Sequence, residues 1–124
     1  MEERAMQRLM EIKNRLEVIE KGLNEQYPRF KADPDITGQI TDLKDYVQEE
    51  RKRIQKQKAR GELSEFESAF IEPAINDVYL SSLDKIRRGS KPSSSVNGYI
   101  FDTSSTLSYW LHAISDFETR NQIK

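Results

Sequence analysis

Cysteine is absent from this chain of 124 residues. Disulfide bonds, thiolate catalysis and cysteine-ligated zinc are therefore excluded. Histidine occurs only once, at His112, and a single imidazole cannot supply the paired Glu-x-x-His motifs of a di-iron helical bundle. The glycine-rich phosphate loops and the Gly-x-Ser-x-Gly turn of hydrolases are missing as well. We therefore expect no enzymatic activity, no cofactor and no metal.

Long hydrophobic runs are also lacking, since no segment approaches the ~18 apolar residues of a membrane-spanning helix. The first residues are rich in Glu and Arg, which does not fit the apolar core of a signal peptide. The net charge is only −1, so no overall attraction to nucleic acid or to acidic lipid is expected. These features favour a cytoplasmic protein that does not bind membranes.

A regular spacing of apolar residues dominates the N-terminal segment. The steps alternate between four and three residues, in the series Ala5, Leu9, Ile12, Leu16, Ile19, Leu23. This heptad spacing predicts a helix from about Glu2 to Asn24 with one narrow apolar stripe. Met6 and Met10 widen the stripe, either as core filling or as an adaptable binding surface.

A second helix with similar spacing is predicted from Asp35 or Thr37 to about Arg60. Its apolar series is Ile36, Ile40, Leu43, Val47, Ile54. The connector at residues 25–35 contains two prolines and lets the second helix fold back antiparallel on the first. The alternative is that the first helix pairs with its own copy in a dimer.

A kinked third helix is predicted over residues 62–88. Ser64 and Glu67 have the spacing of a capping box, and Pro73 indicates either a kink or the first turn of a new helix. Phe66 and Phe70 share one face, whereas the apolar residues after Pro73 lie on another. Arg87, Arg88 and Gly89 have the pattern of a helix C-terminus.

A serine-rich loop is predicted over residues 89–105, followed by a fourth helix over residues 106–120. Within the loop, Asn97-Gly98 is typical of a tight hairpin turn, so Val96 to Phe101 could form a short β-hairpin. The fourth helix has a strong apolar stripe, formed by Leu107, Trp110, Leu111, Ile114 and Phe117.

Together these patterns predict one all-α domain over residues 1–124. An antiparallel hairpin at residues 1–60 packs with two further helices in an irregular four-helix bundle. Hydrophobic residues make up 35% of the chain and charged residues 33%. So thin a core gains much from an additional apolar interface, and we expect a homodimer.

The most basic segment is Arg51 to Arg60, with six Lys or Arg in ten residues. On a helix, four of these cations form a candidate binding stripe: Lys52, Arg53, Lys56 and Arg60. Such a stripe can follow phosphate groups, so a nucleic-acid-binding accessory protein is one hypothesis. An ordinary solvated face, with Glu49 paired to Arg53, is the alternative.

Several aromatic residues lie off the main apolar stripes and form a candidate interface: Tyr27, Phe30, Phe66, Phe70 and Tyr109. Aromatic side chains dominate binding hot spots, although a second layer of core would use them equally well. His112 and the acidic residues of the third helix could serve catalysis only if brought together in space. The leading hypothesis is a non-enzymatic protein-protein interaction module, such as an adaptor, inhibitor or regulator.

Overall fold

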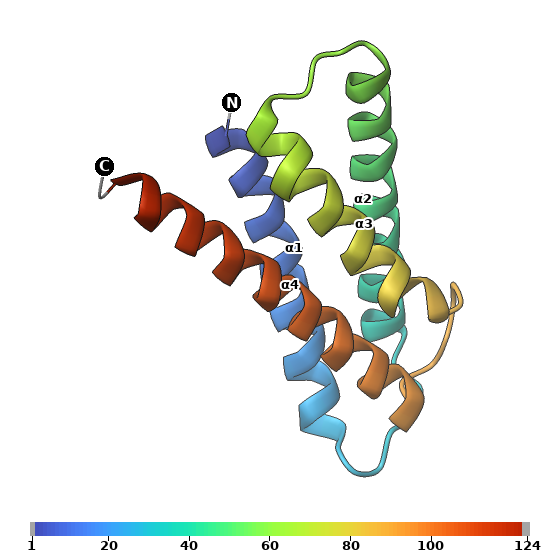
Figure 1. Ribbon diagram of the computed structural model, residues 1–124. Helices are drawn as coiled ribbons and strands as arrows, with labels where there is room; N and C mark the ends of the chain where they lie inside the picture. The colour runs from blue at the N-terminus through green and yellow to red at the C-terminus, as the bar shows by residue number, and fades with distance from the viewer. Residues whose placement is uncertain (1, 123–124) are drawn as a thin grey trace.

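The computed structural model describes residues 2–122, which form a bundle of four α-helices (Figure 1). The helices run α1 (Glu2–Gln26), α2 (Pro34–Ala59), α3 (Glu72–Ser81) and α4 (Ser94–Gln122). Each runs antiparallel to the next, and α4 returns to pack on α1. The all-α prediction is confirmed, and no residue from 2 to 122 lies in a β-strand.

Helices α1 and α2 form the predicted antiparallel hairpin. Every residue of the heptad series from Ala5 to Leu23 is buried, with at most 4% of its surface exposed. Arg8 bonds to Glu50, and Arg15 lies over the Tyr46 ring 4.6 Å from its centroid. Because α2 and α4 of the same chain cover this series, the first helix pairs within the chain rather than requiring a second copy.

Helix α2 begins one residue before the predicted range. Asp33 caps it, because its Oδ1 accepts hydrogen bonds from the backbone N–H of Asp35 (3.0 Å) and Ile36 (3.3 Å). Pro34 occupies the first turn, where its missing N–H costs nothing. At the other end Gly61 has a φ of +68°, the left-handed conformation that favours glycine after a helix.

A π-helical turn, Glu67–Ile71, precedes α3. Pro73 lies in the first turn of α3 and has no N–H to donate to the carbonyl four residues back. The wider turn accommodates this loss, as the N–H of Glu72 bonds to the carbonyl of Glu67. Residues 65–81 are helical without a break, so Pro73 follows a local π-helical distortion of one continuous stretch and does not begin a separate helix.

The predicted third helix is too long at its C-terminal end. Helix α3 ends at Ser81, and a 3₁₀ turn follows at Leu83–Lys85. Leu83 and Ile86 are buried as expected, but a spacing of three residues fits an α-helix and a 3₁₀ turn equally well. Periodicity alone could not distinguish the two.

The predicted loop over residues 89–105 is confirmed only up to residue 93, and its possible hairpin at Val96 to Phe101 is wrong. Helix α4 begins at Ser94, and Ser93 Oγ accepts a hydrogen bond from the N–H of Val96 at 3.1 Å. The buried residues Val96, Ile100, Thr103 and Leu107 repeat the heptad spacing of α1. Burial of this series against the bundle outweighs the turn preference of Asn97-Gly98.

Candidate interaction site

Three phenylalanine rings gather at the end of the bundle where α1 begins and α4 ends. Phe66 and Phe70 lie with their centroids 5.4 Å apart, and Phe117 of α4 lies 6.0 Å and 4.8 Å from them. Phe66 and Phe70 are half-buried, whereas Phe117 is 38% exposed. This phenylalanine cluster is an apolar surface that the chain leaves partly in contact with water.

The phenylalanine cluster borders a hollow of about 790 Å³. Its apolar lining is Met6, Phe66 and Phe117, and its polar lining is Glu3, Ser64, Glu65, Glu118 and Asn121. All three glutamates are exposed. We call this feature the acidic hollow, because it combines an apolar floor with a rim of carboxylates.

Local sequence holds Phe66 and Phe70 in place. The N–H of Glu67 bonds to Ser64 Oγ at 3.1 Å, and the N–H of Ser64 bonds to Glu67 Oε1 at 3.1 Å. These reciprocal bonds are the predicted capping box. They fix the chain on both sides of Phe66, and the π-helical turn then carries Phe70 beside it.

The candidate aromatic interface does not form one patch. Tyr27 and Phe30 pair edge to face at the opposite end, in the connector after α1, with centroids 6.1 Å apart. Tyr109 packs against Trp110 midway along α4, and Trp110 Nε1 donates a hydrogen bond to Asp77 at 2.9 Å. Of the five predicted residues, only Phe66 lines the acidic hollow, and Phe70 packs beside it.

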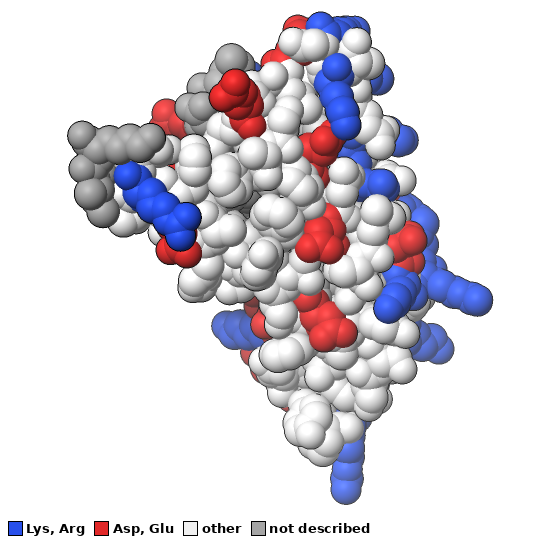
Figure 2. Space-filling model, viewed as in Figure 1, with Lys and Arg blue, Asp and Glu red and all other residues white. Residues whose placement is uncertain are grey.

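The candidate basic stripe is partly neutralised by neighbouring acids. Lys52 lies 3.9 Å from Glu49, and Arg60 lies 3.9 Å from Glu62. Lys56 is exposed, and within residues 2–122 its ammonium forms no ion pair. Figure 2 shows Lys and Arg along the edge formed by α2, whereas the face over α3 and α4 is largely uncharged.

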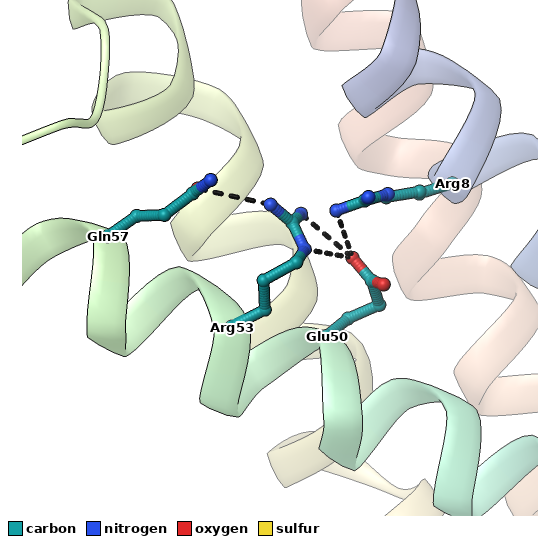
Figure 3. A network of polar contacts seen from close by, with 4 residues as sticks. All are labelled: Arg8, Glu50, Arg53 and Gln57. Atoms are coloured by element: carbon teal, nitrogen blue, oxygen red, sulfur yellow. Dashed lines mark hydrogen bonds and ion pairs between the residues drawn. The ribbon is translucent and has the colours of Figure 1, made fainter.

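Arg53, the fourth member of the basic stripe, belongs to a network between α1 and α2 (Figure 3). Its guanidinium bonds to Glu50 at 2.9 Å and to Gln57 at 3.1 Å, and Arg8 reaches the same carboxylate at 3.3 Å. Burial raises the pKa of Glu50 despite the opposing effect of Arg8. Arg53 therefore serves the helix hairpin and is not free to follow phosphate groups.

Among residues 2–122, no hydrogen bond or ion pair joins His112 to an acidic side chain. His112 is exposed, and its Nδ1 lies 3.0 Å from the backbone oxygen of Ser108. Within the part of the chain that the structure describes, no three His, Asp or Glu side chains are placed to hold a metal ion. None of the helices formed by residues 2–122 has the length and apolarity needed to cross a bilayer.

Sequence reasoning missed Phe117 and the carboxylates around it. Phe117 has the correct helical phase for the core, so the pattern placed it there with Ile114, which is indeed fully buried. Its exposure depends on where the facing helices end, which is a property of the whole bundle. Met6, for which the sequence left core filling or a binding surface open, packs against the core and also lines the hollow.

Comparison with known proteins gives no match to any protein-family model, to any curated protein or to any solved structure.

Proposed function

We propose that this protein is a non-enzymatic interaction module that binds another protein at the acidic hollow. The observation that supports this function is the partly exposed phenylalanine cluster of Phe66, Phe70 and Phe117. Exposed aromatic side chains that adjoin a concavity are typical of binding hot spots, because a partner gains most by desolvating them.

The basic stripe gives less support to the nucleic-acid alternative. Arg53 is committed to Glu50, and Lys52 and Arg60 each have an acidic neighbour. Phosphate binding by these three residues would therefore have to displace existing ion pairs, which lowers the net gain from each of them.

A capture experiment tests the proposed function. Because the chain has no cysteine, Lys91→Cys provides a single attachment point in the exposed connector before α4, at the end of the bundle opposite the acidic hollow. The biotinylated protein is incubated with nuclease-treated extract of the cells that express it, and retained proteins are identified by mass spectrometry.

Two further substitutions, each added to Lys91→Cys, make the capture specific to the hollow. Phe117→Ala truncates the exposed ring of the cluster, and Phe101→Ala truncates a ring that is 65% exposed near the start of α4. We expect one protein to be retained by the parent and by Phe101→Ala, and lost with Phe117→Ala. Equal retention by all three, or capture only without nuclease, would contradict the proposal.

A further inference from the structure

The last two turns of α4 extend past the helices that cover the rest of it. Val96, Ile100, Leu107 and Ile114 are buried, but every residue from 115 to 121 is exposed. In Figure 1 the C-terminal part of α4 diverges from α1 after the two helices cross. Phe117 is the one apolar side chain among residues 115–121, and it packs on Phe66 and Phe70 while staying partly exposed.

The acidic hollow lies between two helix ends. Glu3 and Met6 come from the first turns of α1, and Phe117, Glu118 and Asn121 come from the last turns of α4. The segment from Ser64 to Phe66 also contributes to the lining. A helix from a binding partner, laid between these turns of α1 and α4, would repeat the helix packing found elsewhere in the bundle. Its apolar side chains would lie on Met6, Phe66 and Phe117.

The charged residues that line the hollow are all acidic. Glu3, Glu65 and Glu118 are among the lining residues, and no Lys or Arg is. The C-terminal carbonyls of α4, in the turn that carries Glu118 and Asn121, add partial negative charge, which Arg120 in the same turn offsets. At the start of α1 the positive end of the helix dipole is offset by Glu3 in its first turn.

We propose that the partner presents a basic amphipathic helix, which places its apolar face on the phenylalanine cluster and its Lys or Arg side chains on the glutamate rim. This inference rests on the proposed function and adds the chemical nature of the partner. An acidic helix would set like charges against Glu3, Glu65 and Glu118, so charge selects between the two.

A second copy of this chain does not provide such a helix. The most basic segment, Arg51 to Arg60, contains one large apolar residue, Ile54, and Ile54 is only 3% exposed. Ile54 could contact the hollow of a second copy only if it left the core of its own chain. The basic helix must therefore come from a different protein.

Binding of designed peptides tests this partner class. Three fluorescent peptides of about 15 residues are compared by anisotropy: an amphipathic Leu/Lys helix, the same helix with Glu for Lys, and a Leu/Lys peptide shuffled so that no apolar face forms. We expect the amphipathic basic peptide to bind most tightly, and its affinity to fall when the salt concentration is raised.

A matched pair of triple variants isolates the rim from the overall charge. Glu3→Gln, Glu65→Gln and Glu118→Gln remove the rim, whereas Glu25→Gln, Glu49→Gln and Asp102→Asn remove three exposed carboxylates elsewhere. Because both triples change the net charge equally, nonspecific attraction is controlled. We expect about a tenfold loss of peptide affinity with the rim triple and little change with the control triple.

Equal effects of the two triples, or preference for the acidic peptide, would overturn the basic-helix inference. Neither result would touch the proposed function, which depends on capture that is lost with Phe117→Ala. Sedimentation equilibrium provides a separate check: a dimer that dissociates with Phe117→Ala would mean that a second copy occupies the hollow, and would also overturn the inference.

Discussion

Glu50 is the residue in which burial and pairing oppose each other most directly. Its side chain is 12% exposed and lies within bonding distance of Arg8 and Arg53. Burial is the larger effect and raises the pKa of Glu50 above its ordinary value of 4.5. The folded protein therefore holds this proton more tightly than the unfolded chain does.

This difference predicts a sign for the pH dependence of stability. Because the folded pKa is the higher one, the wild-type protein loses stability relative to Glu50→Gln as the pH rises from 4.5 through the raised value. Urea unfolding of both proteins at a series of pH values measures the difference. Glu49→Gln, at a side chain that is 75% exposed, provides the baseline. A wild-type protein that gains stability relative to Glu50→Gln as the pH rises would mean that the two guanidinium groups outweigh burial.

At the scale of the helix, three glycines inside helices have different surroundings. A Cβ built on Gly22 would lie 3.0 Å from Ile36 Cδ1 and 3.1 Å from Cγ1, whereas a Cβ built on Gly38 or Gly98 would meet no atom outside its own helical turn within 4 Å. Gly38→Ala and Gly98→Ala should each stabilise the protein by about 0.5–1 kcal/mol, because alanine is the better helix former. Gly22→Ala should gain less, since Ile36 must move.

Chemical denaturation of the three alanine variants tests both the helix and its packing. Gly98 is the informative position, because a hairpin turn at Asn97-Gly98 would need a positive φ there and alanine would then be destabilising. Loss of stability with Gly98→Ala, while Gly38→Ala behaves as expected, would contradict the start of α4 at Ser94.

A comparison of α4 with the α1–α2 hairpin shows why part of the fold could be predicted from the sequence and the rest could not. The α1–α2 hairpin and the capping box of Ser64 and Glu67 were predictable, because heptad spacing and local hydrogen bonding agreed there. Around Val96 to Thr103 the two signals conflicted: serine, asparagine and glycine favour a loop, while buried residues repeat at helical spacing. Packing decided the outcome, and packing depends on helices distant in sequence.

The candidate site was predictable to a similar extent. Phe66 and Phe70 were placed together correctly, because four residues separate them on one helical stretch. Phe117 was assigned to the core, and Glu3 and Glu118 carried no signal of their own. Only the antiparallel alignment of α1 with α4 brings these residues together.

On the scale of the whole molecule, the chain exposes more surface than its mass requires. A folded monomer of 14.5 kDa is expected to expose about 6,900 Å², whereas this chain exposes 7824 Å². The excess is comparable to the roughly 800 Å² that one partner contributes to an interface of standard size. The projecting turns of α4 contribute to it, in keeping with the proposed binding role.

The four helices share one core, so the chain should unfold as a single cooperative unit. Far-UV circular dichroism follows all four helices, while fluorescence of Trp110, the only tryptophan, follows the α3–α4 contact through its bond to Asp77. We expect the two urea transitions to coincide. In the double variant Tyr46→Trp/Trp110→Phe, the fluorescent reporter moves to the α1–α2 hairpin. A fluorescence midpoint that differs from the circular-dichroism midpoint of the same variant would contradict a single domain.

The bundle brings the first turn of α1 and the last turn of α4 to the same end of the molecule, beside the acidic hollow (Figure 1). A peptide joined after the last turn of α4 through a short flexible linker would therefore meet the hollow at an effective concentration in the millimolar range. At that effective concentration, even a tethered peptide of low affinity would compete with a free partner. A purification tag rich in basic residues at either end would thus act as a tethered inhibitor, and the connector around Lys91 is the attachment point that avoids it.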